Sequence, residues 1–210
     1  MTTLLFTHPA CLEHDPGQSH PESPARLEAV LAALDAPGFD GLERREAPEA
    51  TREQLTRVHP EDYVNEVLDA IPATGHSGLD ADTIVSPGSG EAAKRAAGAV
   101  CAAVDAVAAG EGGNAFCAVR PPGHHAEPAR AMGFCLFNNV AIGAEQARAV
   151  HALERVAVID FDVHHGNGTQ AMFWNDAALF FGSTHQMPLY PGTGGADERG
   201  VADNIVNAPL

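Results

Sequence analysis

The stretch VAVIDFDVHHGNG, residues 156–168, decides how the rest of the sequence is interpreted. It begins as a continuous apolar run, which is typical of a parallel strand buried on both faces, and it ends in acidic residues and histidines. Charged groups at the end of a buried strand are costly unless something pairs them, so a binding site explains them better than a merely solvated strand end. We therefore expect a strand over residues 156–163 with a site at its carboxyl end, where open α/β sheets place their ligands.

Asp160, Asp162 and His164 alternate along this expected strand, so an extended backbone aims their side chains to one side. At about 3.3 Å per residue, the α-carbons of Asp162 and His164 are about 6.6 Å apart, close enough for both side chains to bind one ion. Asp160 and His164 are about 13 Å apart, so Asp160 is expected to support the site from behind. One carboxylate and one imidazole favour Zn²⁺, and such a set also accepts Fe²⁺, Co²⁺ or Mn²⁺.

A second polar segment, RPPGHHA at residues 120–126, follows another expected strand at residues 115–119. Its loop should open on the same edge of the sheet, which brings His124 and His125 towards the metal candidates. Histidines carry protons near neutral pH, so the two side chains suit a general acid and a general base. On its own, an adjacent histidine pair is more often exposed on the surface than catalytic. The expected metal ligands at residues 156–168 make the catalytic interpretation the better one.

Outward from these segments, short apolar runs alternate with alanine-rich helical stretches, which predicts a parallel sheet covered by helices on both faces. We expect one α/β domain over residues 1–210. The expected strands are residues 4–7, 115–119, 156–163 and 179–183, with one more beginning at 205–206. In the first part of the chain we expect one helix capped by Ser23 and stopped at Pro37, one opened by a Thr51–Gln54 capping box, and one restarting at Pro60. Three more helices are expected over residues 89–109, 140–150 and 169–174. Residues 72–82, 120–138 and 185–200 are expected loops.

Composition and net charge favour a globular protein and argue against direct binding of nucleic acid. The chain has 210 residues, 45% hydrophobic and 19% charged, which is typical of a globular protein. Its 12 basic and 28 acidic residues give a net charge of −16, which repels a phosphate backbone and tolerates a cationic substrate. No apolar run is long enough to cross a membrane. The four cysteines lie far apart without a CxxC pair, which favours reduced thiols in a cytoplasmic protein. The oligomeric state is left open.

Four ordered motifs resemble the zinc-dependent histone deacetylase family, which includes bacterial histone-deacetylase-like amidohydrolases, acetylpolyamine amidohydrolases and acetoin-utilisation proteins. They are RPPGHHA at 120–126, GFCLFNN at 133–139, IDFDVHHGNGTQ at 159–170 and YPGTG at 190–194. The segment His20-Pro21-Glu22 is similar to the family's amino-terminal portion. The resemblance implies an arginase/deacetylase-like three-layer α/β/α sandwich with a mainly parallel sheet. It also implies hydrolysis of an acetyl-amide on a lysine-like or polyamine substrate.

The resemblance also implies roles for individual residues. Zn²⁺ is held by Asp162 and His164, and His125 is the proton shuttle with His124 as its electrostatic partner. Asp160 lies behind His124, and Asn167 lies behind His125, where many members carry aspartate. The remaining implied roles are a substrate channel at Gly133, Phe134 and Tyr190 with Asp82 at its mouth, and a structural K⁺ site at Asp160, Asp162, His164, Ser183 and Thr184.

Two parts of the family's machinery have no match in these 210 residues, namely a third metal ligand and an oxyanion-stabilising tyrosine. Catalytic zinc sites use three protein ligands and a water. We therefore expect an amino-terminal portion of a deacetylase, incomplete at its carboxyl end, whose sheet exposes apolar edges. Two alternatives stay open, a non-catalytic remnant and, against the RPPGHH segment, an arginase-like ureohydrolase with two manganese ions.

Overall fold

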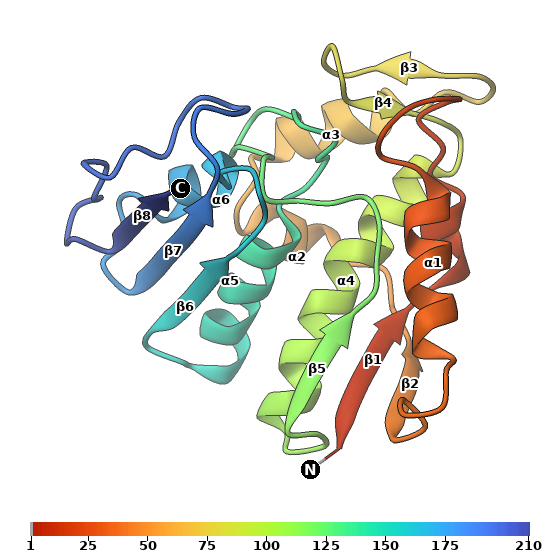
Figure 1. Cartoon of the computed structure of the whole chain (residues 1–210), viewed down its shortest axis with the longest axis horizontal. Helices are drawn as coiled ribbons and strands as arrows, with labels where there is room; N and C mark the ends of the chain where they lie inside the picture. The colour runs from red at the N-terminus through yellow and green to blue at the C-terminus, as the bar shows by residue number, and fades with distance from the viewer. Residues whose placement is uncertain (1) are drawn as a thin grey trace.

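Two three-stranded sheets form the scaffold, and every strand pair within them is parallel (Figure 1). The computed structural model describes residues 2–210. The first sheet has the order β2-β1-β5 and the second the order β6-β7-β8. Their strands are β1 (Thr3–Thr7), β2 (Leu42–Glu46), β5 (Asn114–Cys117), β6 (Val156–Asp160), β7 (Leu179–His185) and β8 (Ile205–Pro209). The predicted α/β class with a mainly parallel sheet is confirmed.

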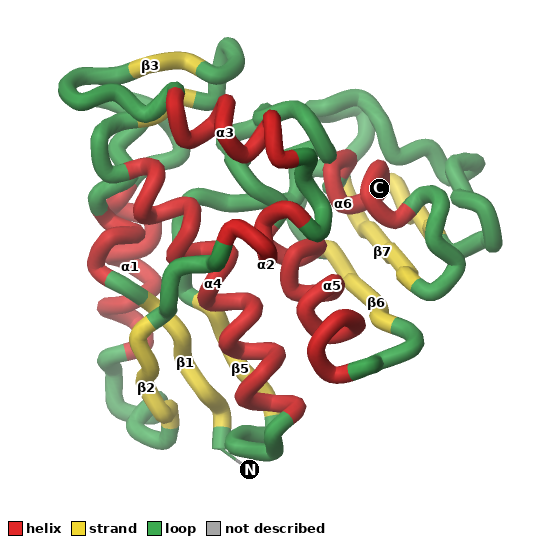
Figure 2. The backbone as a smooth tube through the Cα atoms, turned by 180° about the vertical axis from the view of Figure 1, so that it is seen from behind, coloured by secondary structure: helices red, strands yellow, loops and turns green. Residues whose placement is uncertain are grey.

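Helices join and cover these sheets. Seen from behind, α4 lies across the first sheet and α5 across the second (Figure 2), and the two helices pack against each other. The helical elements are the 3₁₀ helix η1 (Pro9–Leu12) and the α-helices α1 (Pro24–Leu34), α2 (Arg52–Thr56), α3 (Glu61–Asp69), α4 (Ser89–Ala108), α5 (Asn139–His151) and α6 (Asn167–Phe173). A short hairpin pairs β3 (Ser77–Gly78) with β4 (Ile84–Val85). No helix within residues 2–210 combines the length and the apolarity needed to cross a membrane.

The alternation of side chains along β1 builds three layers around the first sheet. Leu4 and Phe6 pack against the small residues of α4, while Leu5 packs on the opposite face against Leu27 of α1. Successive side chains of a strand point to opposite faces, so a strand buried on both faces must be apolar throughout. This explains why residues 4–6 are a continuous apolar run. Small side chains on α4 allow the helix to approach the sheet closely.

The second sheet is packed on one face by α5 and α6. The cluster there joins Ala141 and Ala144 of α5, Phe173 of α6, Phe181 of β7 and Ile205 of β8. On the other face, Ile159 is 64% exposed and Val206 is 48% exposed. In the described part of the chain, helices therefore pack on both faces of the first sheet but on only one face of the second.

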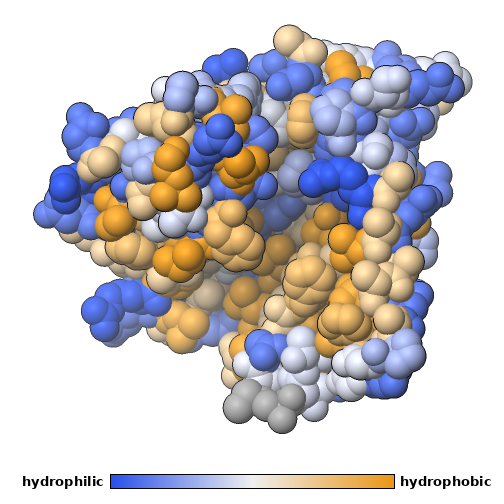
Figure 3. All heavy atoms as spheres, viewed as in Figure 1, coloured by the Kyte–Doolittle hydropathy of each residue, from blue (hydrophilic) through white to orange (hydrophobic). Residues whose placement is uncertain are grey.

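No hydrogen-bond ladder joins β5 to β6 among the described residues, so each sheet presents an unpaired edge to the other. Apolar side chains gather around the hollow between them (Figure 3). Phe116 on β5 is 47% exposed and Phe161 beyond β6 is 85% exposed. Large apolar groups at open strand edges invite pairing with further chain. That the sheet is incomplete stays a prediction.

Three expectations about the elements were wrong in detail. The strand expected to reach Val163 ends at Asp160, where its pairing with β7 also ends. The strand β2 was missed because its sequence, LERRE, has no apolar run; it is an edge strand whose polar side chains face solvent. The expected loop over residues 72–82 contains β3. The predicted capping box at Thr51 is confirmed, whereas Ser23 precedes α1 without a side-chain cap.

Candidate functional site

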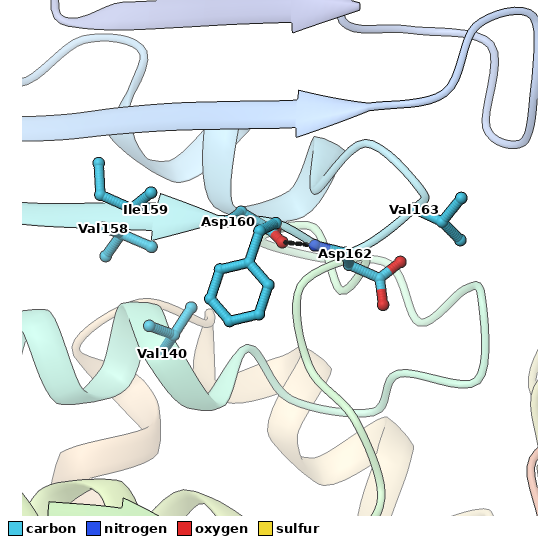
Figure 4. A pocket seen from close by; sticks show the side chains of 7 residues that line it. Val140, Val158, Ile159, Asp160, Asp162 and Val163 are labelled. Carbon is cyan, nitrogen blue, oxygen red and sulfur yellow. Dashed lines mark hydrogen bonds between the residues drawn. The ribbon is translucent and has the colours of Figure 1, made fainter. Parts of the chain in front are cut away.

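The polar residues after β6 sit on two consecutive side-chain turns and not on an extended strand. The N–H of Asp162 donates to Asp160 Oδ1 at 3.0 Å, and the N–H of His164 donates to Asp162 Oδ1 at 2.8 Å. Figure 4 shows the first of these bonds beside the open edge of β6. Aspartate readily bonds the backbone two residues on, which competes with the strand ladder. The turns place Asp162 Oδ1 3.2 Å from His164 Nδ1, so the two proposed metal ligands are neighbours.

The histidine pair meets this strand end from the loop after β5. His124 Nδ1 lies 2.8 Å from Asp160 Oδ2, and His125 Nδ1 lies 2.8 Å from Asn167 Oδ1. The two imidazole rings are 4.0 Å apart between centroids. His124 Nε2 lies 4.0 Å from Asp162 Oδ1. The structure thus brings together the residues that the sequence placed on two separate strand ends.

A cavity of about 510 Å³ opens above these groups. Phe134 and Tyr190 form two of its walls, and the Tyr190 ring stands edge-on to His125 with centroids 5.1 Å apart. Asp82 also lines the cavity and accepts the N–H of Gly133 at 3.2 Å. The full lining is Pro21, Arg26, Asp82, Pro122, His124, His125, Gly133, Phe134, Asp162, Val163, His164 and Tyr190.

Gly133 is required where the wall touches His125. Its φ is +57°, and an added Cβ would overlap the imidazole ring of His125. A side chain at this position would be strained by the backbone and would also displace the ring. The close approach of the wall to the histidine thus depends on the absence of a side chain.

Burial sets the protonation of the site. His125 is 4% exposed, and burial, with the neighbouring His124 in second place, lowers its pKa to about 4. For Asp160, burial acts to raise the pKa, but the hydrogen bond and charge of His124 together with the bond from the Asp162 N–H outweigh it, and the pKa is lowered. Burial raises the pKa of Tyr190 to about 12, so the phenol stays neutral. At neutral pH the site therefore holds a neutral His125 and an ionised Asp160.

Among the described residues, Asp162 and His164 lie side by side without a third metal ligand. Within residues 2–210, no group of three or more His, Cys, Asp or Glu side chains is placed to hold a metal ion. Asp162 and His164 have donor atoms that zinc accepts, and they fit two of the three protein ligands of a catalytic site. Of the residues proposed for K⁺, Ser183 bonds His185 Nδ1 at 2.9 Å and Thr184 is exposed. The K⁺ site stays a prediction.

A buried ion pair behind the histidine loop was missed by the sequence reasoning. Arg120 Nε and Nη2 donate to the two carboxylate oxygens of Glu22 at 2.5 Å each. The same guanidinium donates to the carbonyls of Cys11 and His14 at 2.9 Å. The available signal was an arginine directly after the apolar run of residues 115–119, because a charge that is buried must find a partner.

The segment around Glu22 connects this ion pair to the cavity wall. His14 is buried between Ser89 and Glu22, so it does not line the cavity. His20 packs edge-on against Phe134 with ring centroids 4.9 Å apart. One face of the wall therefore depends on the segment that Arg120 holds.

We expect the folded chain to lose stability steadily as the pH falls. Burial lowers the pKa of His59 from 6.5 to about 4, so between these values the unfolded chain binds a proton that the folded chain does not. The free energy of unfolding then decreases by about 1.4 kcal/mol per pH unit from this group. Urea unfolding at pH 7, 6 and 5 measures the slope. His59→Gln should reduce it, whereas the exposed His76→Gln should not; equal slopes in all three proteins would contradict the assignment.

The buried carboxyl group of Glu22 extends this loss of stability to lower pH. Burial acts to raise its pKa, but the bonds from His14 and Arg120 outweigh it, and the pKa falls to about 2. A lowered carboxyl pKa stabilises the fold above the unfolded value of 4.5, and this stabilisation is lost as the pH falls towards 2.

Comparisons with known proteins agree with this geometry. Residues 20–210 match the histone deacetylase domain. The histone deacetylase-like amidohydrolase of Pseudomonas aeruginosa is 46% identical over 197 residues, which is 91% of this chain and 51% of that protein. The probable deacetylase of Archaeoglobus fulgidus is 40% identical over 216 residues, which is 100% of this chain and 59% of that protein.

A solved structure shows the same relation in three dimensions. The crystal structure of the HDA15 HD domain superposes with a TM-score of 0.94 and 36% identity, over 99% of this chain and 62% of that one. The chain spans between 51% and 66% of the length of the first curated relatives it matches. With the domain match extending from His20 to the last residue, the chain belongs to the histone deacetylase family.

Proposed function

We propose that this chain carries the proton-transfer and metal-binding residues of a zinc-dependent deacetylase. The substrate is an acetyl-amide on a lysine-like or polyamine side chain. The observation that carries the proposal is the convergence of two strand ends, where His124 meets Asp160, His125 meets Asn167, and both rings face the cavity that Asp162 and His164 line.

Asp162 and His164 would hold the zinc ion, which when bound polarises the acetyl carbonyl. The neutral ring of His125 accepts the proton of the attacking water at Nε2, because its Nδ1 is engaged by Asn167. His124 shares a hydrogen bond with the carboxylate of Asp160, which fixes the orientation of its ring towards the cavity. The same pair of histidines then supplies the proton that the leaving amine needs.

The cavity walls suit an extended acyl side chain. Phe134 and Tyr190 present aromatic surface on two sides, which excludes water from the reacting group. The net charge of −16 attracts a cationic amine and repels nucleic acid. We therefore propose as substrate an acetylated amine whose molecule carries further, unacetylated cationic amines, and no direct contact with nucleic acid.

A zinc-loaded preparation of the chain, assayed with an acetyl-lysine peptide and with an acetylated polyamine, tests the function. Release of acetate together with one zinc per chain is the expected result. Zinc without turnover, or neither, would support the alternative of a non-catalytic chain. That alternative is favoured by one observation, that the described residues bring together two ligands and not three. Urea released from arginine or agmatine would favour the ureohydrolase instead.

Replacing Asp162 with alanine should weaken zinc binding by more than the roughly 10–100-fold loss that changes behind a ligand produce. The reason is that one of the two neighbouring donors is removed. Elemental analysis after dialysis against a zinc buffer measures the effect without any assay of turnover. Asp197→Ala is the matched control, because Asp197 is an exposed acid outside the cavity. Full zinc content in the Asp162 variant would overturn the ligand assignment.

A further inference from the structure

The carboxylate of Glu127 lies one hydrogen bond behind the partner of His125. Asn167 Oδ1 lies 2.8 Å from His125 Nδ1, and Asn167 Nδ2 donates to Glu127 Oε1 at 2.9 Å. His125 and Asn167 are both buried, and Glu127 is half-buried. The neighbouring ring, His124, bonds directly to the carboxylate of Asp160. The two histidines therefore reach a carboxylate by different routes, one direct and one through an amide.

The surroundings of the Asn167 amide decide which way it faces. Its nitrogen end has two neighbours, Glu127 Oε1 at 2.9 Å and Met132 Sδ at 3.4 Å. A carboxylate oxygen and a thioether sulfur accept hydrogen bonds and do not donate them. Both therefore require the NH₂ end of the amide. The oxygen end is left for His125, which must then carry its hydrogen on Nδ1.

Glu127 is itself held in place by the loop that follows the histidine pair. Its backbone N–H donates to the carbonyl of Arg130 at 3.0 Å, which closes a tight turn. The next residue, Pro128, accepts a hydrogen bond from the buried ring of His59 at 3.0 Å. The acceptor behind Asn167 is thus fixed by two contacts that are independent of the cavity.

We propose that Glu127 is a positioning residue that holds His125, through Asn167, in the tautomer with hydrogen on Nδ1. The catalytic meaning of this role rests on the proposed function, because it leaves the lone pair of Nε2 to accept a proton in the cavity. Without Glu127, only the weaker acceptor Met132 Sδ still favours this orientation, so the amide can turn over and donate its NH₂ to Nδ1. His125 would then carry its hydrogen on Nε2 and no longer act as a base there.

Nitrogen-15 NMR of the histidine rings tests the proposal at a fixed neutral pH, because protonated and unprotonated ring nitrogens have widely separated shifts. The His125 signals are assigned by their loss in His125→Gln. In the wild-type chain, Nδ1 should show the protonated shift and Nε2 the unprotonated one. In Glu127→Leu, the two shifts should converge or exchange, while Glu127→Gln, which keeps an acceptor oxygen, should retain the wild-type pattern. An unchanged pattern in Glu127→Leu would overturn the proposal.

A second pair of variants covers the case in which Glu127→Leu does not fold. Asn167→Asp alone places two carboxylates within hydrogen-bond distance of each other, which should lower the midpoint of urea unfolding. Combined with Glu127→Gln, the same change leaves one carboxylate facing His125 and an amide behind it. The double variant should recover the unfolding midpoint and should keep the Nδ1 protonated shift. A double variant no better than Asn167→Asp would overturn the proposal. Neither measurement needs turnover, so a failed deacetylase assay leaves this test intact.

Discussion

Replacing Arg120 with methionine should lower the free energy of unfolding by about 3–5 kcal/mol, the usual cost of removing one partner of a buried ion pair. The change leaves the carboxylate of Glu22, which is 0% exposed, without its cation. It also removes the donors to the carbonyls of Cys11 and His14. Equilibrium unfolding in urea at pH 7 measures the loss.

The exposed pair of Lys94 and Glu49 is the matched control, since its 2.6 Å separation is close to the 2.5 Å of the buried pair. Lys94→Met should cost about 1 kcal/mol or less, because solvent screens a surface pair. Combining Arg120→Met with Glu22→Gln should recover part of the loss, because the buried charge is removed as well. Equal costs for Arg120→Met and Lys94→Met would show that burial of the pair does not matter.

Replacing His125 with alanine should lower the rate of deacetylation by about 10²–10⁴-fold, the contribution of one positioned acid–base group. Zinc content should stay unchanged, because His125 is neither of the two proposed ligands. The pairing of lost turnover with retained metal separates a proton-transfer role from a metal-binding one. Steady-state kinetics on an acetyl-lysine peptide, with elemental analysis of the same sample, provides both numbers.

His76→Ala serves as the control for this experiment, since His76 is exposed and does not line the cavity. It should retain the wild-type rate. Retained activity in the His125 variant would remove His125 from the mechanism. Loss of zinc in that variant would instead place the ring in contact with the metal.

The sequence predicted the strands and helices whose own residues form a continuous apolar run or an alanine-rich stretch. The apolar runs at residues 4–7 and 179–183 and the alanine-rich stretch at 89–109 correspond to strands β1 and β7 and helix α4. It did not predict β2, because an edge strand needs no apolar run when its side chains face solvent. Nor did it predict the end of β6 at Asp160, since an alternating pattern does not reveal that the aspartates bond their own backbone.

For the site, the sequence identified the candidate residues and, through the family resemblance, Asp160 and Asn167 behind the two histidines, but it missed the charged groups further out. The histidine pair and the residues after β6 were identified by type and spacing, and the structure brings them to one cavity. Glu22 and Glu127 could not be found in this way. Each acts across a long separation in sequence, 98 residues to Arg120 and 40 residues to Asn167. Such pairs depend on the tertiary arrangement, which no local pattern encodes.

Because no ladder joins β5 to β6 among the described residues, the site is assembled from two sheets that other contacts hold together. His124 and His125 belong to the loop carried by the first sheet, while Asp160 belongs to the second. The packing of α4 against α5 joins these halves, and the carbonyl of His124 also accepts the N–H groups of Gly168 and Thr169 of α6 at 3.0 and 3.2 Å. At Gly143 of α5, an added Cβ would overlap the side chain of Val100 of α4. An added methyl group at Gly143 would therefore press on Val100, which lines the same hollow as His124 and Asp160, and should loosen the hydrogen bond between those two side chains.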